Sequence, residues 1–139
     1  MNQDQEHLRL LSLFHYVYAG LAALFACIPI IHLLMGLLMV TKPEFFGPGK
    51  NQPPAALGWV FIIIGSFFIF CGWLFAALVA WSGHCLGRRK NYTFCLVMAG
   101  VACLFMPFGT ALGVFTIIVL ARPSVKALFR AGPEAPPIK

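Results

Sequence analysis

Two polar side chains lie deep inside apolar stretches of the sequence and are the first candidates for chemistry. His32 falls about 12 Å from the outer end of a long apolar run, and Ser66 lies about 13 Å inside the next run. An ionisable residue at such a depth is expected to mark a functional site. The alternative, which we prefer, is a neutral imidazole held by a hydrogen bond to Ser66, because a neutral ring is cheaper to bury than a charge.

A soft-metal site can be drawn around the same histidine. Met35 and Met39 share a helical face with His32, and with Met106 they would offer ligands suited to Cu(I). Methionine stripes in apolar helices usually serve packing. No second histidine lies at the depth of His32, as a bis-histidine haem would require. The sequence therefore predicts no cofactor and no metal.

The residues of common catalytic machineries are also missing from the apolar runs. All four acidic residues lie outside these runs, so a carboxylate proton relay or a metal-dependent lipid transferase has no residues to use. The stretch Trp81-Ser82-Gly83-His84 lacks a nucleophile elbow and is interpreted as a helix end. Cys85 is the one cysteine outside the predicted spans and a weak candidate for palmitoylation. We expect no enzyme and no catalytic residue.

The composition places these residues in a membrane. The chain has 139 residues, of which 60% are apolar and 10% charged, which is too few charges to cover a soluble domain. The expected fold is a single all-α membrane domain. Its predicted segments span about 10–40, 57–81, 91–106 and 110–121, with an interfacial helix at about 123–130.

The last two segments are expected to form a short hairpin, broken near Pro107 and partly re-entrant. This hairpin keeps eight of the ten Lys and Arg residues on one side, which predicts that both termini are cytoplasmic. The first run is too long for a cleaved signal and is expected to remain as an anchor. In the outer loop, whose composition predicts no regular structure, Phe45 and Phe46 either anchor at the interface, as we prefer, or cover the hairpin tip.

The cytoplasmic side carries a basic rim. The general excess of Lys and Arg on the cytoplasmic side of membrane proteins explains this rim best, and we expect the rim to contact anionic lipid head groups. Binding to an acidic partner subunit is the alternative. Binding to nucleic acid is not expected. The rim comprises Arg88, Arg89, Lys90, Lys126 and Arg130.

Small residues predict where helices pack closely. Gly58, Gly65 and Gly72 recur every seven residues and form one stripe, and Gly109 and Gly113 form a shorter one. Packing within the chain is favoured over dimerisation. Pro29 is expected to kink the first segment.

Several stretches of the sequence together carry a family resemblance. They are Asn91-Tyr-Thr-Phe-Cys-Leu-Val-Met-Ala-Gly, the turn Cys103-Leu-Phe-Met-Pro-Phe-Gly-Thr and the segment from Leu112 to Lys126, with His15-Tyr16-Val17 and the glycine-rich second segment. In these stretches the chain resembles a family of small, uncharacterised bacterial membrane proteins. The resemblance implies a four-segment protein of the bacterial inner membrane and transfers no activity.

Three functions remain as hypotheses. The first is a non-enzymatic accessory or scaffold subunit of a membrane complex, with other subunits or a second copy as partners. The alternative is a small homo-oligomeric channel or transporter, whose path would use His32, Ser66, Thr110 and Thr116. A cofactor- or metal-binding redox subunit is third.

Overall fold

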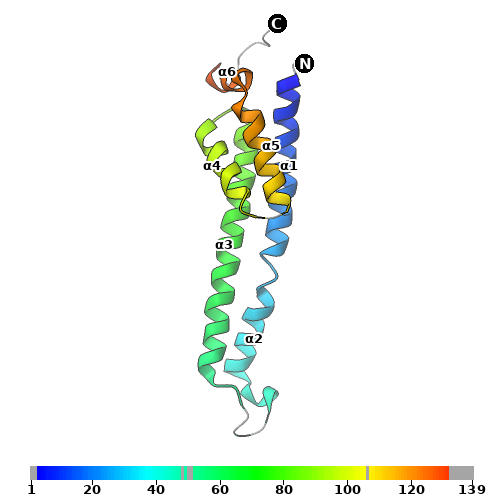
Figure 1. Ribbon diagram of the computed structural model, residues 1–139. Helices are drawn as coiled ribbons and strands as arrows, with labels where there is room; N and C mark the ends of the chain where they lie inside the picture. The colour runs from blue at the N-terminus through cyan, green and yellow to red at the C-terminus, as the bar shows by residue number, and fades with distance from the viewer. Residues whose placement is uncertain (1–2, 48, 50–51, 106, 132–139) are drawn as a thin grey trace. The chain divides into compact units, whose positions relative to one another are not determined.

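The computed structural model describes residues 3–47, 49, 52–105 and 107–131, which form helices joined by short turns (Figure 1). No strand occurs in this part of the chain, and the all-α prediction is confirmed. The elements are α1 (Gln3–Phe25), α2 (Ile30–Thr41), the 3₁₀ helix η1 (Pro43–Phe46), α3 (Ala55–Arg88), α4 (Tyr92–Ala102), α5 (Phe108–Ala121) and α6 (Pro123–Ala131).

Within the described residues, two stretches are long and apolar enough to cross a membrane. One is α1 continued by α2, and the other is α3; α5 and α6, taken as one bent pair, would make a third. These lengths and compositions are compatible with a membrane protein. The interpretation of Trp81-Ser82-Gly83-His84 as a helix end is wrong, because α3 continues through it to Arg88.

The chain folds as two compact units. Unit 1 contains the residues up to Gly20 and those from Ala76 onward, and unit 2 contains Leu21–Phe75. In unit 1 the start of α1, the end of α3, α4 and α5 surround an apolar core, in which Leu86, Cys95 and Leu120 are fully buried. Cys85, the weak candidate for palmitoylation, belongs to this core and is buried, which argues against its modification in this structure.

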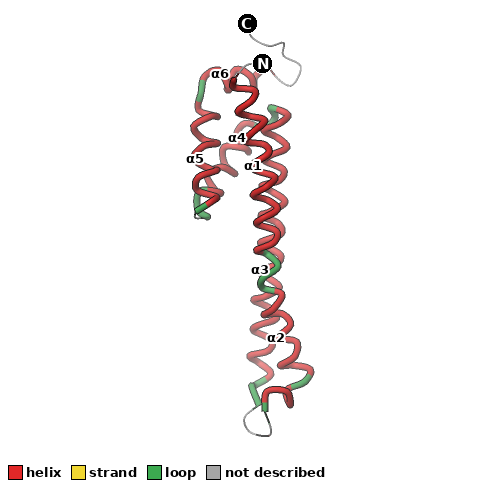
Figure 2. Tube along the Cα trace, turned by 90° about the vertical axis from the view of Figure 1, so that its right-hand side faces the viewer, coloured by secondary structure: helices red, strands yellow, loops and turns green. Residues whose placement is uncertain are grey.

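In unit 1, α4 and α5 form an antiparallel hairpin, visible in Figures 1 and 2. Helix α4 is shorter than the expected 91–106 segment, whereas α5 begins two residues before the expected 110–121 segment. At about 16 and 21 Å, both helices are shorter than a bilayer core of about 30 Å. At the turn, the Thr110 hydroxyl donates to the Cys103 carbonyl over 2.8 Å. Next to it, a Cβ on Gly109 would lie 2.6 Å from the hydroxyl oxygen of Tyr18, so the turn packs against the first half of the 10–40 segment.

Helix α6 follows α5 after a bend of 78°. The bend arises because Arg122 precedes Pro123, which disfavours helical angles, and Arg122 is extended. The buried face of α6 consists of Val125 and Leu128. The Phe129 ring meets the Tyr92 ring edge-on, with centroids 5.6 Å apart.

Unit 2 is a pair of helical segments. Residues 26–29 form turns that interrupt the α-helix, because Pro29 has no backbone N–H to donate. Tighter bonds replace the missing ones, including Ile28 N–H to the Phe25 carbonyl over 3.1 Å. The loop between α2 and α3 contains the short helix η1, although its composition predicted no regular structure, and Phe45 is 79% exposed there.

Candidate functional site

A buried histidine lies in the core of unit 1. His15 continues the buried face that Leu8 and Leu11 begin on α1, and it is 1% exposed. Its Nδ1 lies 2.9 Å from the Leu11 carbonyl oxygen. A carbonyl accepts only, so Nδ1 donates this hydrogen bond and Nε2 is free to bond elsewhere.

That remaining nitrogen has no partner among the described residues. His15 Nε2 is buried without a hydrogen bond, and so is the hydroxyl of Ser82 on α3. Buried polar atoms are nearly always hydrogen-bonded, so each of these two atoms is an exception in an apolar core. The sequence analysis did not single out His15 as buried; its spacing from Leu8 and Leu11 was the available signal.

Helices α1 and α3 approach each other closely beside His15. The Ser12 hydroxyl donates to the Gly83 carbonyl over 2.6 Å. A Cβ on Gly83 would lie 2.9 Å from His15 Cβ, so only glycine fits the contact. A further polar contact lies at the surface, where the Tyr16 hydroxyl oxygen is 3.5 Å from His84 Nδ1.

His32, the leading sequence candidate, lies in unit 2 on α2. Its ring is exposed and stacks on Phe61 of α3, with centroids 6.0 Å apart and an interplanar angle of 14°. Ser66 is also exposed. The described residues give neither side chain a hydrogen bond, so the expected bond between them is not formed in this structure.

The other ligands drawn for Cu(I) differ in exposure. Met35 is exposed and Met39 is partly buried, while Met106 lies outside the described residues. A Cβ on Gly58 would touch Met39 Cβ at 3.1 Å, so this methionine packs at the helix contact. Nowhere in the described part of the chain do three His, Cys, Asp or Glu residues gather as a metal site would require.

The predicted glycine stripe faces the other helical segment of unit 2. A Cβ on Gly72 would lie 2.6 Å from Ala26 Cβ, and one on Gly65 would lie 3.2 Å from the Leu33 amide nitrogen. In unit 1, Gly109 and Gly113 face the backbone carbonyls of Ala102 and Ala99 on α4. These glycines are therefore occupied by contacts within the chain.

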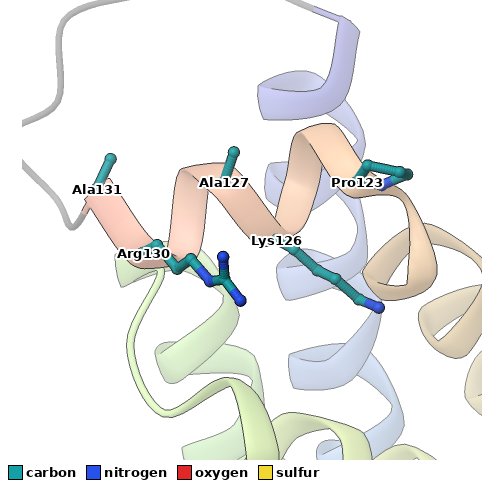
Figure 3. Close-up of a pocket in the computed structure, with 5 residues that line it drawn as sticks. All are labelled: Pro123, Lys126, Ala127, Arg130 and Ala131. Atoms are coloured by element: carbon teal, nitrogen blue, oxygen red, sulfur yellow. The ribbon is translucent and has the colours of Figure 1, made fainter.

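The basic rim lies on unit 1. Arg88 and Lys90 are exposed and Arg89 is half-buried at the end of α3. Figure 3 shows Lys126 and Arg130 extending together from one side of α6, where with Pro123, Ala127 and Ala131 they line an open pocket of about 500 Å³. Such paired cations suit anionic head groups.

One acidic group lies near these cations. Asp4 accepts a charged hydrogen bond from Arg122 over 3.3 Å, which joins the start of α1 to the α5–α6 bend. Hydrogen bonding by the Ser124 side chain, followed by the Arg122 interaction, lowers the pKa of Asp4, although partial desolvation opposes them. This contact orients α6 against α1.

In comparisons with known proteins, no family model matches the chain, and no curated protein or solved structure matches it.

Proposed function

We propose that the chain is a non-enzymatic accessory or scaffold subunit of a membrane protein complex. The observation that carries the proposal is the exposure of His32. An ionisable residue inside a span almost always faces protein or water, because hydrocarbon offers it no hydrogen bond. On α2 the His32 ring stacks on Phe61, and no described residue gives it a hydrogen bond, so a polar group of another subunit would complete its surroundings.

The glycine contacts indicate which face of unit 2 a partner would use. Gly58, Gly65 and Gly72 already pack against the other helical segment of unit 2. A partner would therefore use the exposed face that carries His32 rather than the glycine stripe. Hydrogen bonds between membrane helices contribute about 0.6 kcal/mol on average, and side-chain packing supplies the rest of such an interface.

The proposed setting is the inner membrane of a bacterium, with both termini cytoplasmic. In this arrangement the 10–40 and 57–81 segments cross the bilayer, and α4 and α5 form a re-entrant hairpin. Support comes from the shortness of these two helices and from the packing of Gly109 against Tyr18. The basic rim then faces the anionic lipids of the cytoplasmic leaflet.

A pull-down of the tagged full chain in mild detergent, followed by native mass spectrometry, tests the subunit proposal. We expect a stoichiometric unlike partner, and we expect His32→Leu to reduce its recovery at least fivefold. Leu34→Ala is the matched control because Leu34 is also exposed but lies on the opposite side of α2. Recovery of the protein only as a monomer would exclude the proposal.

The homo-oligomeric channel or transporter remains the second candidate, and the exposure of Ser66 together with His32 favours it. The threonines expected to join the path are engaged, because Thr110 donates to the Cys103 carbonyl and Thr116 to the Leu112 carbonyl. A homo-oligomer without unlike partners would favour this reading. Solute flux in proteoliposomes that His32→Ala abolishes would then establish it.

A further inference from the structure

A groove on unit 1 runs between the start of α1 and the end of α3. It has a volume of about 260 Å³, and its walls combine two arginines with one acid and small residues. The residues that matter here are Glu6, Leu8, Arg9, Ser12, Gly87 and Arg89. Gly87 keeps the floor open, because a Cβ there would lie 3.2 Å from the Ser12 hydroxyl oxygen.

The charges of the groove are unbalanced. Arg9 and Arg89 contribute two guanidinium groups and Glu6 one carboxylate. Within the described residues, the ion pair is between Asp4 and Arg122, and neither Arg9 nor Arg89 has one. Arg89 is nevertheless half-buried. Guanidinium groups bind phosphate oxygens in pairs of hydrogen bonds, so the groove suits one phosphate-bearing anion.

The backbone of Arg89 points to the same role. Its amide bonds the Leu86 carbonyl over 3.2 Å and the Lys90 amide bonds the Cys85 carbonyl over 3.0 Å, which is the Schellman pattern of a helix end. Arg89 takes the left-handed position of this pattern, with φ of 53°, where glycine is the favoured residue. An arginine held at a strained position suggests that its side chain has a function there.

The groove also lies at a suitable depth. Trp81 is exposed on α3 and belongs to the residue type that concentrates at membrane interfaces. Gly87 lies about 9 Å further along α3, which corresponds to the head-group layer beyond the hydrocarbon. Leu8, at the base of the groove, is buried in the apolar core of unit 1.

From these observations we infer that the groove binds the phosphate group of one anionic glycerophospholipid. Arg9 and Arg89 hold the phosphate oxygens. Glu6 lowers the net charge of the groove to a single positive charge, which one phosphate anion balances. The lipid source rests on the proposed placement of this end of unit 1 at the membrane surface. The phosphate chemistry does not depend on that placement or on any partner that covers His32.

Native mass spectrometry of the full chain, titrated with phosphatidylglycerol or phosphatidylcholine in mild detergent, tests this inference. We expect one phosphatidylglycerol to bind at least tenfold more tightly than phosphatidylcholine. Arg89→Gly relieves the left-handed strain, so the variant should fold at least as well as the wild type and yet bind phosphatidylglycerol at least fivefold more weakly. Arg88→Gln removes the same charge outside the groove and should change binding less than twofold.

Equal losses in Arg89→Gly and Arg88→Gln would overturn the inference in favour of diffuse attraction to the rim, and so would unchanged binding in Arg89→Gly. Competition with glycerol 3-phosphate distinguishes the two sources of phosphate. We expect it not to displace the lipid, whereas displacement at equal concentration would overturn the lipid assignment. A pull-down with Arg89→Gly separates this inference from the subunit proposal. The variant should recover as much of the partner as the wild type does, even though it binds the lipid more weakly.

Discussion

Gly36 of α2 and Gly58 of α3 contact each other backbone to backbone. A Cβ on Gly36 would lie 2.7 Å from the Gly58 carbonyl oxygen, and a Cβ on Gly58 would lie 3.0 Å from the Gly36 carbonyl oxygen. Because the obstructing atoms belong to helix backbones, neither can move aside alone. We expect Gly36→Ala to lower the free energy of unfolding by about 1–3 kcal/mol, the usual cost of overpacking. Reversible unfolding in mixed detergent micelles measures this change.

Two other glycines provide controls for this prediction. A Cβ on Gly20 or on Gly100 would meet no atom within 4 Å, although both residues lie in helices. Alanine has the higher helix propensity, by up to about 1 kcal/mol, so Gly20→Ala and Gly100→Ala should leave the stability unchanged or raise it. Equal destabilisation by all three substitutions would argue against the close contact of α2 and α3.

The orphaned hydroxyl of Ser82 leads to a second prediction. Ser82 is 0% exposed and its Oγ has no hydrogen-bond partner among the described residues, whereas Ser12 Oγ donates to the Gly83 carbonyl over 2.6 Å. Removing an unsatisfied buried hydroxyl releases a desolvation cost, so Ser82→Ala should be neutral or stabilising. Ser12→Ala breaks a made bond and should cost about 0.5–1.5 kcal/mol.

The same unfolding assay compares the two serine variants. A loss in Ser82→Ala as large as that in Ser12→Ala would show that the Ser82 hydroxyl is satisfied in the membrane, for example by a buried water shared with His15. Ser82→Cys, which keeps the approximate volume but weakens the polarity, serves as the control for any cavity that alanine leaves.

The sequence predicted those features that depend on local composition. Apolar runs indicated helices, Pro29 indicated the interruption between α1 and α2, and residues 123–130 were expected to be helical where α6 is found. The burial of His15 was not predicted, because it depends on the contact between α1 and α3, where Gly83 meets the His15 side chain. The spacing from Leu8 and Leu11 indicates one helix face, but which distant segment covers that face leaves no signal in one sequence.

The exposure of His32 also escaped prediction for a physical reason. Depth in a span can be counted along the chain, but the side of the helix that meets the neighbour is decided by packing. Gly36 and Gly58 bring α2 and α3 together at the backbone, and the His32 ring then lies against Phe61 at the edge of the contact. Sequence spacing alone allowed the bond to Ser66 equally well.

Acid should weaken the contact between α1 and the α5–α6 bend. The pKa of Asp4 lies below its ordinary value of 3.8, so its carboxylate stabilises the fold fully above that value. This contribution is lost as the pH falls through the lowered pKa. The Arg122 side chain is 45% exposed, so we expect the loss to stay below about 1 kcal/mol.

Measuring the unfolding temperature of wild type and Asp4→Asn between pH 6 and pH 3 checks this expectation. The two proteins should differ at pH 6 and approach each other as the pH falls below 3.8. Ser124→Ala should shift the convergence toward higher pH, because the Ser124 hydrogen bond is the largest cause of the lowered pKa. A difference that stays constant over the whole range would remove Asp4 from this role.

The proposed re-entrant hairpin predicts a specific pattern of accessibility. Phe45 in the outer loop and Leu104 at the hairpin turn are 79% and 80% exposed, so each tolerates replacement by cysteine in a chain whose native cysteines are changed to alanine. A membrane-impermeant maleimide added to intact cells should label Phe45→Cys and leave Leu104→Cys unlabelled. The reason is that α4 is only about 16 Å long and the neighbouring Gly109 packs against Tyr18, in the first half of the 10–40 segment.

Ser124→Cys, on exposed α6, is the control for the cytoplasmic side, and it should react only after the cells are permeabilised. Leu104→Cys should then be labelled more slowly than Ser124→Cys, because the turn lies within the apolar layer and the maleimide needs a thiolate in water. Rapid labelling of Leu104→Cys in intact cells would instead mean that the hairpin crosses the bilayer completely. Because its two helices are shorter than the bilayer core, such a crossing would require a locally thinned membrane. The two head-group layers would then contact unit 1 at the hairpin turn and at the basic rim.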